Sequence, residues 1–154
     1  IEDNEGNVIS EFSPLMEEVI SEESSYKMLD MLRAVINEGT GGRVRFRYGI
    51  KADMAGKTGT TNNNSDGWFM GFTPSLVSGV WVGGEDRDIH FDTMQFGQGA
   101  SMALPIWAIY MNKVYADKSL GYSQDEKFIF PEDFDPCNDV TGSNESGGLD
   151  EFFE

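Results

Sequence analysis

A lysine, two threonines and a glycine stand in immediate succession at Lys57, Thr58, Gly59 and Thr60. This combination could support acyl transfer to or from a bound peptide. Threonine hydroxyls can hydrogen-bond a carboxylate, and a lysine ammonium makes its surroundings positive for an anionic substrate. Because Gly59 has no Cβ, an acyl donor could approach the backbone closely there. A backbone N–H near Thr60 could form half of an oxyanion hole, a donor typically worth about 3–4 kcal/mol in the transition state.

These residues must be held on an extended strand for that chemistry to be possible. Alternate side chains of a strand share a face, so Lys57 and Gly59 are predicted to point one way and Thr58 and Thr60 the other. At the edge of a sheet, the free backbone groups of such a strand can pair with an extended peptide. The alternation and the intervening turn residues predict three strands, at residues 52–61, 66–72 and 77–83.

A nucleotide site is the competing interpretation, because Gly56, Lys57 and Thr58 match the end of a phosphate-binding P-loop. That motif needs a glycine five residues before Gly56, where this chain has Lys51, and it opens a helix. The residues that follow, 62–67 (NNNSDG), are turn formers. We therefore set the P-loop aside, which leaves a plain surface strand as the alternative to an acyl-transfer site.

Two helices are predicted to flank the strands. Ser21 is a suitable N-cap for the first, which is expected to run to Glu38 and stop at Gly39. The second is expected over residues 103–116, with Pro105 tolerated in its first turn. Its face toward the sheet is predicted to consist of Ala103, Ile106, Trp107, Tyr110 and Val114.

Three other patterns carry weaker predictions. Residues 1–3 and 7–12 are expected to form a hairpin, and the alternating residues 43–47 (RVRFR) a basic strand or loop edge exposed to solvent. The acidic run 85–92 could present Asp and His side chains to a metal, but Phe91 stands where an EF-hand loop needs glycine. We favour a solvated acidic loop and predict no metal site.

Composition limits the classes of partner. The formal net charge of −16, from 27 acidic and 11 basic residues, argues against binding to nucleic acid or to an anionic membrane surface. No apolar run is long enough to span a bilayer. Cys137 is the only cysteine, so an internal disulfide is impossible. At 154 residues the chain can form one domain that buries about two thirds of its unfolded surface.

Four motifs follow one another along the chain: 55–61 (AGKTGTT), 66–74 (DGWFMGFTP), 79–83 (GVWVG) and 103–107 (ALPIW). Lys-Thr-Gly, inside the first, is one of three motifs shared by serine β-lactamases and penicillin-binding proteins. The four motifs together resemble the C-terminal part of the transpeptidase domain of class A penicillin-binding proteins of the 1A type. Residues 19–41 resemble the helix before the strand in that family, and the resemblance covers roughly residues 1–116.

The resemblance implies a fold and an activity. The fold is α+β, an antiparallel sheet with flanking helices that forms the C-terminal portion of the β-lactamase/transpeptidase-like serine D,D-peptidase fold. The activity is D,D-transpeptidation, which cross-links peptidoglycan stem peptides and is blocked when a β-lactam acylates the enzyme. Lys57 would act in catalysis by shaping the field around the nucleophile. Thr58, Gly59 and Thr60 would bind substrate, with the Thr60 N–H in the oxyanion hole, and no cofactor is implied.

The nucleophile of the family is expected to lie outside this chain. Residues 24–27 (SSYK) spell Ser-x-x-Lys, but they sit on the helix that leads into the strand, whereas the family's nucleophile lies far upstream with a Ser-x-Asn motif in between. No Ser-x-Asn occurs in this chain. We interpret Ser24 as a polar residue of the first helical turn and expect the isolated chain to be inactive. A non-catalytic β-lactam sensor or D-Ala-peptide-binding module is the alternative.

The resemblance also predicts the surroundings of the chain. Residues 1–120 would belong to the transpeptidase domain and 121–154 would form an acidic, irregular tail. The parent, which would also carry a glycosyltransferase, is expected on the periplasmic face of the bacterial inner membrane, anchored by a segment outside this chain. This fragment itself would make no membrane contact.

We also expect this part of the domain to self-associate. The helical lobe of the family lies outside this chain, so one face of the sheet should expose apolar surface. Light scattering at high concentration checks this, and a monomer there would contradict it.

Overall fold

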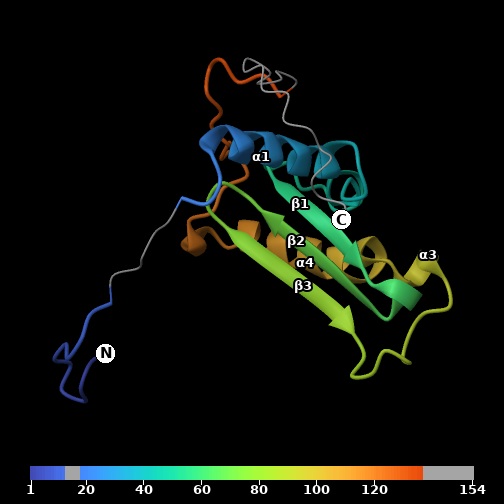
Figure 1. The fold of residues 1–154 in the computed structure, drawn as a ribbon, viewed down its shortest axis with the longest axis horizontal. Helices are drawn as coiled ribbons and strands as arrows, with labels where there is room; N and C mark the ends of the chain where they lie inside the picture. The colour runs from blue at the N-terminus through green and yellow to red at the C-terminus, as the bar shows by residue number, and fades with distance from the viewer. Residues whose placement is uncertain (13–17, 137–154) are drawn as a thin grey trace, which may run out of the picture.

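The fold is a three-stranded antiparallel sheet flanked by two long helices (Figure 1). The computed structural model describes residues 1–12 and 18–136. The predicted α+β class is confirmed, and the sheet order is β1-β2-β3. The strands are β1 (Ala55–Thr60), β2 (Asp66–Phe72) and β3 (Val77–Gly83), and the helices are α1 (Glu22–Asn37), α2 (Arg43–Phe46), α3 (Met94–Gly97) and α4 (Gly99–Ala116), with 3₁₀ turns η1 (Asn62–Asn64) and η2 (Lys118–Leu120).

The three predicted strands are confirmed to within a few residues. β1 begins at Ala55 rather than at residue 52, while β2 and β3 have the predicted bounds. The first connection reverses the chain with Asn63 and Asn64 at positive φ, a conformation that asparagine tolerates better than most residues. In the second connection the Thr73 N–H donates to the Leu76 carbonyl at 2.8 Å. Both links are therefore the tight turns that antiparallel neighbours need.

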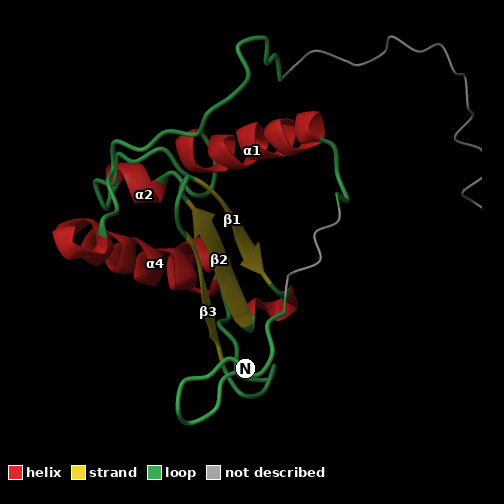
Figure 2. Cartoon of the chain, turned by 90° about the vertical axis from the view of Figure 1, so that its left-hand side faces the viewer, coloured by secondary structure: helices red, strands yellow, loops and turns green. Residues whose placement is uncertain are grey.

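Helix α4 covers one face of the sheet and forms the core with it (Figure 2). Trp107 of α4 is fully buried, and its ring meets Phe69 of β2 edge-on at 5.0 Å between centroids. Its Nε1–H donates to Ser78 Oγ at 2.8 Å, so the polar edge of the indole is satisfied. A Cβ at Gly71 would lie 2.6 Å from Trp107 Cε2, so the sheet needs a glycine there to admit the indole.

The prediction for α4 was wrong in two respects: the residue at which the helix begins, and part of the face that it buries. The helix begins at Gly99, so Pro105 lies in the second turn rather than the first. Ile106 and Tyr110 are about half exposed instead of covering the sheet. Apolar residues surround this helix on all sides, so periodicity could not decide which of them faces inward. The buried apolar residues of α4 are Ala100, Ala103, Leu104, Trp107, Ala108, Met111, Val114 and Tyr115.

Residues 43–47 were predicted as a strand or loop edge, and this was wrong. Arg43–Phe46 form a single helical turn, α2, in which only Val44 is buried. Arg45 turns inward and donates to the carbonyls of Ile50 and Ala52, and also to Asn37 Oδ1. Five alternating residues are too few to separate a strand from a helical turn. The arginine instead holds the segment that leads into β1.

A buried carboxylate fixes the start of β1. Asp53 accepts hydrogen bonds from Arg33 Nε of α1 at 3.0 Å and from the Phe128 N–H at 3.2 Å. The Phe128 ring also meets Phe72 of β2 at 5.8 Å between centroids. Residues 121–136 contain no helix or strand but pack against the domain through these contacts. The boundary at residue 120 stays a prediction, and residues 137–154, including Cys137, lie outside the described ranges.

The predicted N-terminal hairpin is reduced to one bridge between Glu2 and Val8. The Asp3 carboxylate accepts hydrogen bonds from the Asn7 side-chain amide and from the N–H groups of Asn7 and Glu5, and these bonds hold the pKa of its carboxyl below the usual range. Gly6 has φ +85°, which glycine adopts without strain. The predicted reversal of the chain is therefore confirmed, but the predicted strands at residues 1–3 and 7–12 are longer than the single bridge observed.

Candidate functional site

Strand β1 lies at an edge of the sheet. It pairs with β2 on one side, and no other strand of the described ranges pairs with its outer side. Its register places Lys57 opposite Met70, Thr58 opposite Phe69 and Gly59 opposite Trp68. An edge strand of this kind can accept an extended peptide through main-chain hydrogen bonds.

Lys57 projects from the face of the sheet that α4 does not cover. Its side chain is exposed, and Nζ donates to the Thr58 carbonyl at 2.8 Å. Within the described ranges it forms no ion pair with a carboxylate. The ammonium therefore remains available as a local positive charge in a chain of formal charge −16.

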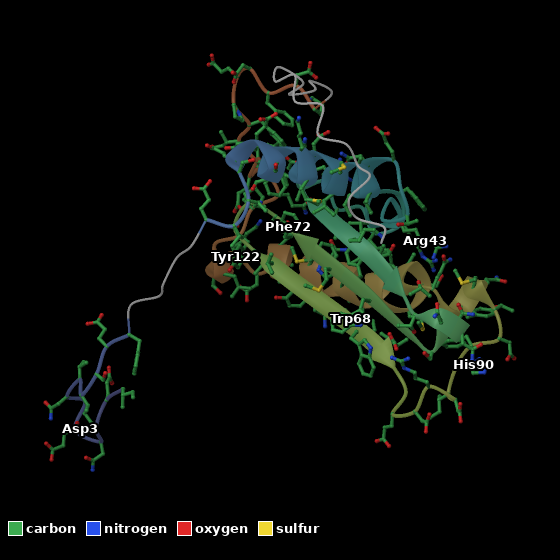
Figure 3. The ribbon with its side chains drawn as sticks, viewed as in Figure 1. Asp3, Arg43, Trp68, Phe72, His90 and Tyr122 are labelled. Carbon is green, nitrogen blue, oxygen red and sulfur yellow. The ribbon has the colours of Figure 1, made fainter. Side chains whose placement is uncertain are left out.

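The same face carries two tryptophans that the sequence had not marked as part of the site. Trp68 of β2 and Trp81 of β3 are cross-strand partners with ring centroids 6.5 Å apart (Figure 3 labels Trp68). They are 45% and 49% exposed, and Met70 beside them is 45% exposed. We call this surface, made by Lys57, Trp68, Met70 and Trp81, the open face.

The two threonines point to the opposite side, so the predicted alternation along β1 is confirmed. Thr58 Oγ1 lies 3.0 Å from Thr40 Oγ1, in the loop that follows α1. Thr60 Oγ1 accepts a hydrogen bond from the Gly99 N–H at 3.0 Å, at the first residue of α4. Both hydroxyls thus already have a protein partner. The Thr60 hydroxyl keeps its proton to donate, and carboxylate binding by either group stays a prediction.

Helix α4 begins directly against the sheet because glycines meet there. A Cβ at Gly99 would lie 2.5 Å from the Trp68 carbonyl oxygen and would overlap the Gly59 carbonyl. A Cβ at Gly67 would lie 2.9 Å from Gly99 Cα. The backbone of the helix therefore touches the backbone of β1 and β2, and the Gly99–Thr60 hydrogen bond anchors the end of β1.

Gly59 has a structural role besides the one predicted for it. A Cβ at this position would lie 3.3 Å from Trp68 Cβ, tighter than ordinary van der Waals contact. A side chain at position 59 would therefore push on Trp68, its neighbour on the open face. Close approach of an acyl donor to Gly59 stays a prediction.

Ser24 lies at the opposite end of α1 from the loop that contacts β1 through Thr40. It occupies the first turn of α1, where its N–H donates to Ser21 Oγ at 3.3 Å and confirms Ser21 as the N-cap. The two serine hydroxyls are hydrogen-bonded to each other at 2.9 Å, and Lys27 forms an ion pair with Glu23 at 3.0 Å. Thirteen residues of helix separate Ser24 from the end of α1, about 20 Å along its axis.

The acidic loop between β3 and α3 is exposed throughout residues 85–92 (Figure 3 labels His90). Within it, the Asp88 N–H donates to Asp86 Oδ1 at 3.1 Å, and the Phe91 carbonyl accepts a hydrogen bond from Asn64 Nδ2 at 3.2 Å. Among the described residues, no cluster of three or more His, Cys, Asp or Glu side chains is arranged to hold a metal ion.

Sequence reasoning missed Thr40 and Gly99 as parts of this site. Each touches β1 from a segment far away in the chain: Thr40 lies 18 residues before Thr58, and Gly99 lies 39 residues after Thr60. No periodic pattern signals such contacts. The only local hint was the run of glycines around Thr40, at residues 39–42, which allows the backbone to pass close to the strand.

Comparison with known families gives a match that covers half of the chain. The family model described as "Penicillin binding protein transpeptidase domain" matches residues 10–86. This range contains α1, α2 and the whole sheet, and therefore Lys57, Thr58, Gly59 and Thr60.

Individual relatives carry the name of the same family. "Penicillin-binding protein 1A" of Aquifex aeolicus is 43% identical over 114 residues, which is 74% of this chain and 15% of that protein. The protein of the same name from Pseudomonas aeruginosa is 37% identical over 132 residues, 86% of this chain and again 15% of the relative. A crystal structure of penicillin-binding protein 1A from Haemophilus influenzae superposes with a TM-score of 0.60 at 29% identity, covering 73% of this chain and 17% of that one. The chain thus spans about 15% of the length of the curated relatives it matches.

Proposed function

This chain belongs to the family of penicillin-binding protein transpeptidase domains, and on that basis we propose that it forms the substrate-binding strand of a peptidoglycan D,D-transpeptidase. The parent enzyme would cross-link stem peptides during cell-wall synthesis. The observation that carries the proposal is β1 itself, an edge strand inside the matched range that presents Lys57 on an uncovered face. A peptide laid along the outer side of β1 would be held by main-chain hydrogen bonds, beside an unpaired ammonium.

Each motif residue has a distinct part in this proposal. Lys57 provides positive charge next to the reacting group, which favours the deprotonated form of a nearby hydroxyl and attracts the carboxylate of a D-alanyl end or a β-lactam. Thr58 and Thr60 contribute hydroxyls to that carboxylate, and the Thr60 N–H donates to the developing oxyanion. Gly59 has no side chain, so it leaves room for the acyl group to lie against the backbone of the strand.

The attacking serine is supplied by a part of the protein outside this chain. An acyl-transfer site needs its nucleophile, base and oxyanion donors within hydrogen-bond reach of one another. Ser24 does not meet that condition, because it lies at the far end of α1 from the Thr40–Thr58 contact. We therefore propose that both the Ser-x-x-Lys and the Ser-x-Asn motifs precede this chain in the parent, as does a glycosyltransferase.

The parent would work outside the cytoplasm, on the periplasmic face of the bacterial inner membrane. Across residues 1–12 and 18–136, no helix combines the length and the apolar character needed to cross a bilayer. We propose, from the family to which the chain belongs, that the anchor is a segment outside it. The open face, with Trp68, Met70 and Trp81 about half exposed, is the surface through which the isolated chain would self-associate.

A fluorescent penicillin tests the proposal. The complete parent is expected to form a covalent adduct that survives denaturing electrophoresis, whereas the isolated 154-residue chain is expected to form none. The Ser24→Ala variant of the parent serves as the matched control and should label like the unmodified protein.

Two results would overturn this assignment. Adduct formation by the isolated chain that disappears in Ser24→Ala would place the nucleophile in α1. A parent that binds penicillin reversibly without acylation would instead support a non-catalytic β-lactam sensor.

A further inference from the structure

The loop between α1 and α2 brings a further hydroxyl group to the substrate strand. Helix α1 runs beside β1 (Figures 1 and 2), and the residues after its end carry Thr40 to the strand. Thr40 Oγ1 lies 3.0 Å from Thr58 Oγ1, and within residues 1–12 and 18–136 neither hydroxyl has another hydrogen-bond partner. An exposed loop threonine is thus paired with a residue that is proposed to bind substrate.

The position of Thr40 is fixed by the backbone on both sides of it. The Gly39 N–H donates to the Ala34 carbonyl at 3.0 Å, and the Gly41 N–H donates to the Val35 carbonyl at 2.9 Å. A Cβ at Gly41 would lie 3.0 Å from the Val35 carbonyl oxygen, so a side chain there would press on the last turn of α1. The loop is therefore held against the end of the helix, and Thr40 meets β1 from a fixed direction.

The two threonines of β1 each meet a possible donor from another segment. Thr60 Oγ1 accepts from the Gly99 N–H, which can only donate, so the proton of Thr60 is left for another acceptor. Between Thr40 and Thr58, either hydroxyl could be the donor. A bound carboxylate would decide the direction, because an ionised carboxylate has no proton to give and must accept from Thr58. The Thr40 proton must then point to Thr58.

We propose that Thr40 is a positioning residue for the substrate carboxylate, an inference that rests on the proposed function of β1. Thr40 donates to Thr58 Oγ1, and Thr58 donates to the carboxylate of a D-alanyl end or of a β-lactam. Each hydrogen bond in such a chain polarises the next, so the Thr58 hydroxyl becomes a stronger donor than it would be alone. Thr40 itself does not touch the substrate.

Penicillin acylation of the complete parent tests the role of Thr40. Thr40→Val removes the hydroxyl but keeps the branched shape, and it is expected to lower the rate constant for acylation by benzylpenicillin about fivefold, the factor that one ordinary hydrogen bond is typically worth. Thr40→Ser keeps the hydroxyl and should restore most of the rate. Thr93→Val makes the same change at an exposed threonine without a capping hydrogen bond and should react normally. A normal rate in Thr40→Val would overturn the proposal.

The methyl ester of benzylpenicillin separates positioning from a loss of structure. The ester replaces the anionic carboxylate by a neutral group, to which a hydrogen bond is weaker. Thr40→Val should therefore lose less of its acylation rate with the ester than with the acid. An equal loss with both compounds would mean that Thr40 only holds the loop against β1, and this result would overturn the proposal.

A double variant shows whether the two hydroxyls act in one chain. Thr58→Val alone is expected to slow acylation by at least about tenfold, because hydrogen bonds to charged groups are stronger than neutral ones. Since Thr40 acts through Thr58, the variant with both changes should react no more slowly than Thr58→Val. Additive losses would overturn the proposal.

The same series distinguishes this inference from the proposed function. An unmodified parent that forms no adduct would overturn the proposed function, and the positioning role with it. A parent that is acylated normally with Thr58→Val would remove the carboxylate role of Thr58, and therefore that of Thr40. A slow Thr58→Val beside a normal Thr40→Val would overturn the positioning role alone.

Discussion

Replacing Lys57 by alanine in the complete transpeptidase is expected to lower the rate constant for acylation by penicillin by about a hundredfold or more. A side chain that assists proton transfer or holds charge beside the reacting group typically contributes about 10²–10⁴ in rate. Lys57 is exposed, and among the described residues its ammonium donates a hydrogen bond only to the neighbouring Thr58 carbonyl, so its truncation leaves the packing of β1 intact. Stopped-flow or gel-based acylation kinetics measure the effect.

Two further variants show whether charge or position is responsible. Lys57→Arg keeps the positive charge but replaces a compact ammonium by a planar guanidinium, so an intermediate rate is expected. Lys51→Ala removes another exposed cation, four residues before β1, and should acylate normally. If Lys57→Ala reacts as fast as Lys51→Ala, then the ammonium has no part in the chemistry.

The sheet could be predicted from the sequence because its signals are local. Alternating side chains mark β2 and β3, and turn residues such as Thr73 and the asparagines at 62–64 separate the strands. The faces of β1 follow from strand geometry alone, which is why Lys57 and Thr58 were assigned to opposite sides correctly.

The helices show where local patterns stop being informative. Residues 43–47 alternate like a strand, yet Arg45 gains three hydrogen bonds by turning inward on a helical turn. On α4 the apolar residues nearly encircle the helix, and the inner face is chosen by the groove that Gly71 leaves for Trp107. Both outcomes depend on tertiary contacts that override a short pattern.

The candidate site also has a part that could be predicted from local signals and a part that could not. Lys57 and its neighbours could be found from their types and spacing, but the contacts that hold them could not. Arg45 and Asp53 secure the approach to β1, and the Gly99 N–H secures its end through Thr60. The site is thus a strand anchored at both ends by residues distant in sequence, and no strand in residues 1–12 or 18–136 pairs with its outer side.

The close approach at the end of β1 makes Gly99→Ala the most disruptive small substitution that we expect in this fold. The added methyl group would lie 2.5 Å from the Trp68 carbonyl oxygen and would overlap the Gly59 carbonyl, and backbone atoms cannot rotate away as a side chain can. Overpacking of this kind costs about 1–3 kcal/mol, and the helix start must also move off Thr60, so a loss of about 3 kcal/mol in the free energy of unfolding is expected.

Gly42→Ala provides the matched control for this effect. Gly42 has φ −56° and ψ −24°, which alanine adopts readily, and the nearest atom to a new Cβ, the Gly39 carbonyl oxygen at 3.3 Å, needs to give by only a few tenths of an ångström. Its free energy of unfolding in urea should change by no more than about 0.5 kcal/mol. Because the Gly99–Thr60 hydrogen bond positions the last residue of the substrate strand, Gly99→Ala should also slow acylation of the complete enzyme at temperatures where it stays folded. Equal stability of the two variants would mean that α4 does not depend on the glycine contact, and the end of β1 would then need another anchor.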